Sequence, residues 1–169
     1  MFKTFPKLRR VTMADAENLL KWKNEEDTRK NSIVTDAVIK IEDHLVWLEK
    51  TLNDPTVDFW IVEYDGQDMG DVRLNHGEEE TEVSIRLDKS CRGKGLATDV
   101  IGIMSRLKNY KLDPDLSKVN CKRLVAKITA HNLASMRVFI TNGYKPYEYI
   151  RVPYSTLTGR SIDYYIFKQ

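Results

Sequence analysis

The strongest constraint on the fold is a change of hydrophobic period within one stretch of sequence, residues 82–109. Residues 82–87 alternate polar and apolar side chains, which predicts a strand. From Leu96 onward the apolar residues recur at helical spacing, which predicts a helix over the rest of the stretch. Gly93 and Gly95 lie in the turn between these two elements. A strand that leads directly into a helix is typical of α/β folds.

The remaining elements are predicted from hydrophobic period and from turn residues. Helices are expected from Thr12 or Asp15 to Trp22, over residues 41–52 and over residues 133–141. Strands are expected over residues 8–12, 58–63, 69–74, 123–129, 144–152 and 162–167. Residues 24–32 and 112–122 are polar and predict loops, and Asp65-Gly66 predicts a hairpin turn. This order predicts one α/β domain over residues 1–169, with a mixed sheet and helices on both faces.

Charge and composition argue against several classes of partner. Lys and Arg number 27 and Asp and Glu 25, and this balance argues against nucleic acid or an anionic membrane as the main partner. No apolar run approaches the ~20 residues that span a bilayer, and the N-terminus lacks the apolar stretch of a signal peptide, so a cytoplasmic protein is expected. Cys91 and Cys121 have no second Cys or His at metal-ligand spacing, so free thiols and no metal are expected.

The turn between the strand and the helix has the properties of an anion site. Glycines at positions 93 and 95 allow the backbone to approach a ligand closely, and the first N–H groups of the helix have no helical partner. Arg92 and Lys94 add positive charge, so a phosphate or a pyrophosphate is the natural ligand. The spacing fits neither the dinucleotide-binding fingerprint nor the P-loop. The alternative is a glycine-containing turn with solvated basic residues.

Two motifs resemble the signatures of the GNAT acetyltransferase superfamily. The segment Arg92-Gly93-Lys94-Gly95-Leu96-Ala97 is similar to its Gln/Arg-x-x-Gly-x-Gly/Ala loop. The segment Asn132-x-x-Ser135-x-x-x-Phe139-x-x-x-Gly143-Tyr144 is similar to its second signature, and the element order is similar over nearly the whole chain. The resemblance implies an acetyl-CoA-dependent N-acetyltransferase with a mixed, mostly antiparallel sheet that is splayed at one point.

The resemblance also implies where acetyl-CoA lies. Backbone groups of Ser84 to Leu87 would bind the pantetheine arm and polarise the thioester carbonyl, and backbone amides from Gly93 to Thr98 would bind the pyrophosphate. Asn132 would contact the pantetheine, with a plain helix N-cap as the alternative role. The cofactor contacts implied in this way are Ile85, Arg86, Leu87, Arg92, Gly93, Lys94, Gly95, Leu96, Ala97, Thr98, Asn132, Ser135 and Phe139.

Direct attack by an amine requires a neutral amine, an oxyanion donor and a thiolate that can leave. Glu82 is the first candidate for the base, because some relatives place a catalytic Glu at the start of the splayed strand; an exposed carboxylate is the alternative. His131 and Asp71 are weaker candidates. Ser84 is placed at the thioester carbonyl.

This chain departs from the family pattern at the residue that would donate a proton to the leaving thiolate. Many relatives have a Tyr where this chain has Phe139, which cannot donate a proton. Tyr144, Tyr147 or a water molecule is therefore expected to donate. The catalytic candidates are then Glu82, Ser84 and Tyr144.

Acceptor specificity is expected in the N-terminal half. The segments Trp22-Lys23-Asn24, Arg29 and His44-x-x-Trp47 resemble a branch that includes ribosomal-protein N-acetyltransferases. Within it the pattern is similar to the acetyltransferases of the pseudaminic-acid pathway, which act on a nucleotide-linked 4-amino-dideoxy sugar. The phosphates of such an acceptor would need basic side chains, for which Arg29, Lys30, Arg73 and Arg86 are candidates and solvated surface charges are the alternative. The expected substrate contacts are Trp22, Asn24, Arg29, His44, Trp47 and Arg73.

Three other functions stay open at this stage. The first is acetylation of a protein N-terminal amine, and the second is a non-catalytic module that binds coenzyme A. The third is acetylation of an antibiotic or of a polyamine, which an acidic pocket would favour. A homodimer through the C-terminal strands is also expected from the resemblance.

Overall fold

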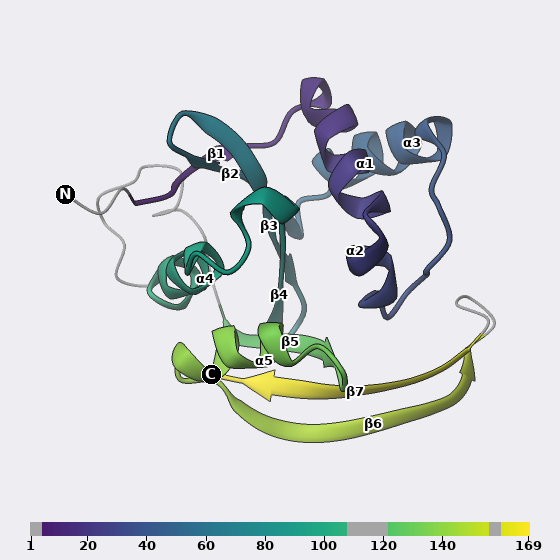
Figure 1. The fold of residues 1–169 in the computed structure, drawn as a ribbon, viewed down its shortest axis with the longest axis vertical. Helices are drawn as coiled ribbons and strands as arrows, with labels where there is room; N and C mark the ends of the chain where they lie inside the picture. The colour runs from purple at the N-terminus through teal and green to yellow at the C-terminus, as the bar shows by residue number, and fades with distance from the viewer. Residues whose placement is uncertain (1–4, 108–121, 156–159) are drawn as a thin grey trace.

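The computed structural model describes residues 5–107, 122–155 and 160–169. One seven-stranded sheet has the order β1-β2-β3-β4-β5-β7-β6 (Figure 1). Its strands are β1 (Lys7–Arg10), β2 (Val57–Tyr64), β3 (Gln67–His76), β4 (Glu80–Leu87), β5 (Arg123–Thr129), β6 (Lys145–Ser155) and β7 (Arg160–Lys168). The helices are α1 (Ala16–Asn24), α2 (Glu26–Lys30), α3 (Ile41–Leu52), α4 (Leu96–Ser105) and α5 (Leu133–Thr141), with short 3₁₀ turns at Met13–Asp15 and Lys89–Cys91. Among these helices none is long and apolar enough to cross a membrane.

The pairing of the strands confirms the expected mixed, mostly antiparallel sheet. Every neighbouring pair is antiparallel except β4 and β5, which run parallel. The β2–β3 hairpin turns at Asp65 and Gly66, whose φ angles are 51° and 75°. Left-handed conformation at both central residues matches the right-handed twist of the flanking strands, as Asp-Gly predicts.

The parallel pair β4–β5 is joined for only part of its length. Glu80, Thr81 and Glu82 pair with the first three residues of β5, whereas β4 continues to Leu87. Beyond Glu82 the two strands therefore diverge, and the backbone N–H and C=O groups of residues 83–87 are not paired with β5 on that edge. Figure 1 shows this separation near the middle of the sheet.

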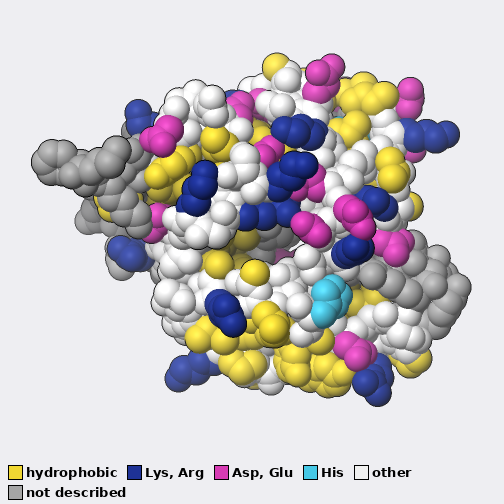
Figure 2. Space-filling view, in the orientation of Figure 1, with side chains coloured by type: hydrophobic (Ala, Val, Ile, Leu, Met, Phe, Trp, Pro, Cys, Tyr) yellow, Lys and Arg dark blue, Asp and Glu magenta, His cyan; other side chains and the backbone are white. Residues whose placement is uncertain are grey.

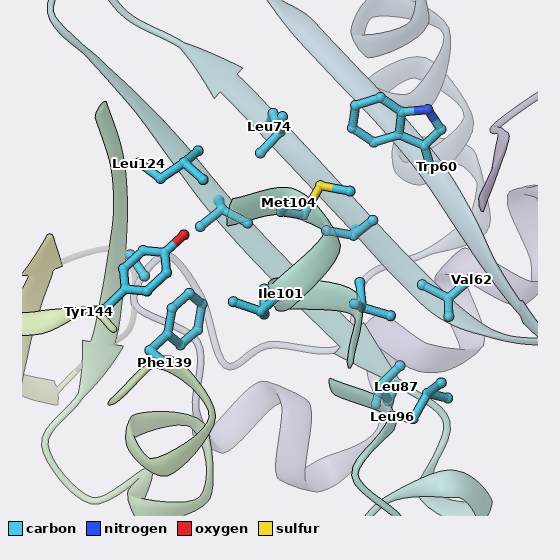
Figure 3. Close-up of a cluster of buried hydrophobic side chains, with 14 of the residues drawn as sticks. Trp60, Val62, Leu74, Leu87, Leu96, Ile101, Met104, Leu124, Phe139 and Tyr144 are labelled. Atoms are coloured by element: carbon cyan, nitrogen blue, oxygen red, sulfur yellow. The ribbon is translucent and has the colours of Figure 1, made fainter. Parts of the chain in front are cut away.

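The alternation of side chains along β4 divides the molecule into two layers. Val83 and Leu87 point to the face covered by α4 and α5, where they join the larger hydrophobic core (Figure 3). Ser84 and Arg86 point to the opposite face, on which α1, α2 and α3 lie. A second hydrophobic cluster packs α1 and α3 on β2; it contains Val11, Ala16, Leu19, Trp22, Leu48, Phe59 and Ile61. A ligand that passes between β4 and β5 can therefore reach both faces.

The structure differs from the sequence-based expectation at the polar segment 24–32. This segment contains the short helix α2, with no buried residue and with an ion pair of 2.6 Å between Lys30 and Glu26. An amphipathic period is absent from so short a helix, so the hydrophobic pattern could not reveal it. Helix α4 ends at Ser105 with Arg106 as its C-cap, four residues before the expected end at Asn109. The loop expected at 112–122, apart from Lys122, and residues 157–159 between the last two expected strands lie outside the described residues.

Candidate active site

The loop before α4 has the geometry of an anion site. Gly93 and Gly95 have φ angles of 74° and 82°, in the left-handed region that glycine adopts without strain. Gly95 is the N-cap of α4, it provides no side-chain cap, and the Asp99 amide makes the helical bond to the Gly95 carbonyl. The amides of the first turn are thus left for a ligand at the positive end of the helix. A cavity of about 400 Å³, the loop cavity, borders Gly93, Gly95, Leu96, Ala97, Thr98, Asn132 and Ser135.

The two basic residues of the loop differ in position. The Arg92 guanidinium donates to the Leu87 carbonyl at 2.9 Å and pairs with the carboxylates of Glu25 and Asp27 on the opposite layer. Lys94 is exposed and does not border the loop cavity. Arg92 therefore fixes the loop against α2, and the attraction for an anion comes mainly from backbone amides and the helix dipole.

Asn132 and Ser135 stand at the start of α5, across the loop cavity from α4. The Asn132 Oδ1 accepts a hydrogen bond from the Ser135 amide at 3.1 Å, so Asn132 is the N-cap of the helix. Both residues also line a second cavity between β4 and β5. Capping and contact with a cofactor are therefore compatible at Asn132.

This second cavity, the central cleft, occupies the opening where β4 and β5 diverge. Its volume is about 470 Å³, and residues 82–87 of β4 and 126–129 of β5 form its sides. Glu82 lies at its inner end, where its carboxylate is 2.7 Å from the Lys127 Nζ. The hydrogen bond that the Lys127 Nζ donates to Glu82 is the main reason that the pKa of Lys127 is raised. The cleft shares Ile85, Leu87, Arg92, Asn132, Ala134 and Ser135 with the loop cavity, so the two form one passage.

A third cavity, the acceptor cavity, opens on the other face of β4. Its volume is about 440 Å³, and it is lined by Lys23, Val34, Thr35, Ile39, Asp43, His44, Trp47, Arg73, Ser84 and Arg86. Of these residues, Lys23, Ser84 and Arg86 also line the central cleft. Figure 2 shows Lys and Arg side chains, with acidic side chains among them, around the hollow near the centre of this view. The three cavities thus connect the α4 N-terminus with the opposite layer.

The cations of the acceptor cavity are not equivalent. The Arg86 guanidinium is neutralised by Asp71, which is buried and accepts at 2.9 Å. Arg73 packs its guanidinium over Trp47 and Phe59, 5.5 and 5.8 Å from their ring centroids. The Arg73 Nε is buried and has no hydrogen-bond partner among the described residues, and burial lowers the pKa of this side chain. The cavity therefore carries an excess of positive charge.

His44 adds a neutral face to the same cavity. Its ring stacks on Trp47 with 5.3 Å between centroids, and burial is the main cause that lowers its pKa. Its Nε2 is buried without a hydrogen-bond partner in the described part of the chain. His44 is therefore uncharged at neutral pH, and its ring offers a flat surface beside Trp47.

A model of the acetyltransferase (GNAT) domain family matches residues 7–145 of this sequence. The chain belongs to the GNAT family. It is accordingly an acetyl-CoA-dependent N-acetyltransferase, and acetyl-CoA is its co-substrate. No curated protein matches the sequence.

Solved structures share the fold over almost their whole length. The spermidine N-acetyltransferase of Vibrio cholerae in complex with CoA and spermine has a TM-score of 0.80 at 15% identity, covering 97% of this chain and 94% of that one. A ribosomal-protein-alanine N-acetyltransferase from Brucella melitensis has a TM-score of 0.73 at 20% identity, with coverages of 96% and 98%. A putative acetyltransferase from Salmonella typhimurium with acetyl-CoA has a TM-score of 0.72 at 17% identity, with coverages of 97% and 92%. At these identities the likeness shows a common fold.

The GNAT enzyme brings together most of the cofactor contacts implied by its sequence. Of the implied set, Ile85, Leu87, Arg92, Gly93, Gly95, Leu96, Ala97, Thr98, Asn132 and Ser135 border the loop cavity. Phe139 and Arg86 border the central cleft instead. Lys94 borders neither cavity.

Several predicted acceptor contacts have a different place in the enzyme. Trp22 is 1% exposed in the second hydrophobic cluster, and its Nε1 donates to Asp88. Asn24 exchanges two hydrogen bonds with the backbone of Ile39, and Arg29 donates to the Asp36 carbonyl at 2.7 Å. These three residues do not line the acceptor cavity. Asn24 and Arg29 instead hold the segment 31–40, which supplies part of the wall of the cavity.

Three of the catalytic candidates also lie where the expected role does not fit. Tyr144 is 1% exposed in the hydrophobic core, edge-on to Phe139 (Figure 3), and its hydroxyl lies 3.5 Å from the Ser105 Oγ. It borders none of the three cavities, so its position does not fit a proton donor to the thiolate. Asp71 is committed to Arg86, and His131 borders a separate cavity beside Asp163.

Lys23 lines the site, although the sequence analysis named it only within the segment Trp22-Lys23-Asn24 and gave it no role. It lies in the last turn of α1 and lines both the central cleft and the acceptor cavity. Its Nζ is 3.3 Å from the Ser32 Oγ. A lysine directly after a core tryptophan was a weak signal, because nothing local shows that this turn of the helix faces an opening in the sheet.

Proposed function

We propose that this GNAT enzyme acetylates the primary amine of an acceptor that also carries an anionic group. A nucleotide-linked sugar with a 4-amino group has both features, and it is the acceptor that we favour. The amine would lie near Ser84, where the acceptor cavity meets the central cleft. The phosphates would lie toward Arg73, and the stacked rings of His44 and Trp47 offer a flat surface to a base or a sugar.

The single observation that carries this proposal is that the Arg73 Nε is buried without a hydrogen-bond partner among the described residues. A buried guanidinium donor without a partner is unfavourable unless a ligand supplies one. Arg86 is already paired with Asp71, and beside Arg73 the lining of the acceptor cavity has one further cation, Lys23, and one carboxylate, Asp43. An anionic group that accepts from Arg73 would satisfy the donor and offset the excess charge.

A polyamine acceptor fits this cavity poorly. The spermidine N-acetyltransferase of Vibrio cholerae shares the fold, but a polycation would meet Arg73 and Lys23 at close range. Like charges in a partly buried site repel. The acidic pocket that a polyamine would favour is not formed by the described residues around this opening.

A second candidate acceptor is the α-amino group of a protein N-terminus. It is favoured by the likeness to the ribosomal-protein-alanine N-acetyltransferase of Brucella melitensis. An α-amine is also neutral more often than a lysine side chain at pH 7, so it needs less help from a base. This alternative gives no account of the unpartnered Arg73.

The proposed chemistry assigns roles to residues of β4. The backbone of residues 84–87, open toward the central cleft, would bind the pantetheine and polarise the thioester carbonyl near Ser84. Glu82 would accept the proton lost by the amine, directly or through water. Its contact with Lys127 holds the carboxylate at the inner end of the cleft.

The experiment measures the release of free CoA from acetyl-CoA with three acceptors in parallel. These are a UDP-linked 4-amino sugar, a ribosomal-protein N-terminal peptide and spermidine. Turnover with the sugar alone would support the proposal. Turnover with the peptide alone would replace it by the second candidate, and turnover with spermidine alone would show that the charge argument is wrong.

We also propose that residues 1–169 form one domain that pairs through β6 as a homodimer. β6 is the last strand of the sheet order, and Tyr147 and Tyr149 on it are exposed. An edge strand with exposed aromatic side chains is a suitable surface for pairing. Light scattering coupled to gel filtration tests this directly, and a monomer at high concentration would refute it.

A further inference from the structure

We propose that Lys23 is the catalytic acid that protonates the departing CoA thiolate in this enzyme. The proposal concerns the acetyl-transfer step itself, and it holds for any acceptor amine. It assigns a group to the task that Phe139 cannot perform and that the buried Tyr144 is badly placed to perform.

The position of Lys23 follows from the connection between the cavities. Three described residues, Lys23, Ser84 and Arg86, line both the central cleft and the acceptor cavity. The thioester must lie at this junction, because acetyl-CoA enters along the central cleft and the amine comes from the acceptor cavity. The three residues that line both cavities are therefore the first candidates for the proton donor to sulfur.

Two of the three residues are unsuitable. Arg86 donates to both carboxylate oxygens of Asp71, and a guanidinium does not release its proton in proteins. A serine hydroxyl such as that of Ser84 is a much weaker acid than a thiol and would not protonate a thiolate. Lys23 has an ammonium group with three donors, and Ser32 holds its Nζ beside the central cleft.

The surroundings of Lys23 adjust its acidity to that of a thiol. Burial of the side chain, followed by repulsion from Arg86 and Arg73, lowers its pKa to about 8, against the opposing attraction of Asp71. A thiol has a pKa of about 8.5, so proton transfer from the ammonium to the thiolate is nearly balanced. The other charged or titratable side chains that line the two cavities around Lys23 are Asp27, Asp43, His44, Glu82, Arg92 and Lys127.

In the acetyl-transfer step one bond forms, one bond breaks and two protons move. The amine nitrogen forms a bond to the acetyl carbon, and the C–S bond breaks with its electron pair on sulfur. The proton of the Lys23 Nζ moves to sulfur and gives the CoA thiol. The surplus proton of the new amide nitrogen passes to Glu82. Before the next cycle Glu82 releases this proton to solvent and Lys23 takes one up from solvent, so no proton is gained or lost overall.

The first test needs no acceptor. The rate at which Lys23 reacts with an amine-directed reagent is followed by mass spectrometry as a function of pH in the wild-type protein. A midpoint near 8 is expected, whereas an ordinary lysine titrates near ~10.4. A midpoint at the ordinary value would overturn the proposal.

The second test compares two substitutions with whichever amine turns over in the three-acceptor assay. Lys23→Arg keeps the positive charge but cannot release a proton. Lys23→Met has neither the positive charge nor a proton to release. Both variants are expected to lose about 100-fold in kcat, with KM for the acceptor kept by Lys23→Arg. The fall of wild-type kcat above about pH 8, where the acid deprotonates, should vanish in both. Lys50→Arg, on the exposed end of α3, is the control for a lysine-to-arginine replacement that lies away from the site.

A merely structural or substrate-binding role gives a different pattern. If Lys23 only attracted an anionic acceptor, Lys23→Arg would retain kcat and its pH profile, and the proposal would be wrong. A failure of the anionic-acceptor proposal would appear instead as turnover with the peptide or spermidine alone. Lys23→Arg would then still lose kcat with that acceptor.

Discussion

Replacing Arg73 by Met tests the acceptor cavity through one side chain. Met keeps the apolar contact with Trp47 and Phe59 but removes the guanidinium. A hydrogen bond to a charged group contributes about 1.5–3 kcal/mol, and each ~1.4 kcal/mol is a factor of ten. The KM for an anionic acceptor is therefore expected to rise about 10- to 100-fold, with a smaller change in kcat because Arg73 does not contact the reacting atoms.

The same substitution should leave the fold intact. Loss of two cation–π contacts costs about 0.5–1 kcal/mol each. Removal of a buried donor without a partner stabilises the fold by about 1–3 kcal/mol. The two effects offset each other, so the free energy of unfolding should change little. Steady-state kinetics of CoA release and thermal unfolding are measured together, with Arg123→Met, at an exposed position at the start of β5, as the matched control. A folded Arg73→Met enzyme with an unchanged KM would show that Arg73 does not bind the acceptor.

Three further predictions concern the loop, the base and the acid stability. Gly95→Ala, at a φ of 82°, should lower either stability or acetyl-CoA affinity by about 1–2 kcal/mol, as seen by thermal unfolding with and without CoA, whereas Gly66→Ala in the hairpin should lower stability alone. Glu82→Gln should lower kcat about 100-fold, and equal loss in the Glu80→Gln control would contradict its role as base. The Lys21 Nζ, with further hydrogen bonds from Ser90 and Trp22, lowers the pKa of Asp88, so the stability that this carboxylate contributes is present above about pH 4 and lost below it. Asp88→Asn should therefore be less stable by about 1–2 kcal/mol at neutral pH and lose less stability on acidification, and an unchanged acid transition would exclude this ion pair as its cause.

The elements that sequence analysis placed correctly are those whose signals are local. The expected bounds 41–52, 123–129 and 133–141 coincide with α3, β5 and α5. Hydrophobic period, a Pro after a helix and an Asn N-cap all act within a few residues. The glycine turn before α4 was found for the same reason, because its glycines and the start of the helix are local signals. Its assignment to acetyl-CoA came from the resemblance to the GNAT signature, since glycines before a helix are also compatible with a plain turn.

The acceptor cavity was only partly predicted, because it depends on how distant segments are brought together. Trp22 stands three residues after Leu19, a spacing typical of a helix face in the core, and the structure buries both. Arg73 and Lys23 become neighbours only through the register of β3 with β4 and the packing of α1 on the sheet. Asn24 and Arg29 resembled substrate contacts, but their side chains are used by the segment that shapes the cavity.

The most direct test of the account compares one amino sugar in two forms, with and without its nucleotide. The ratio of kcat/KM for these two acceptors isolates the contribution of the anionic group, since the reacting amine is the same. We expect the nucleotide-linked form to be favoured by about 10- to 100-fold, the range set by one charged hydrogen bond, and we expect Arg73→Met to abolish the preference. Equal kcat/KM for the two forms in the wild-type enzyme would contradict the account.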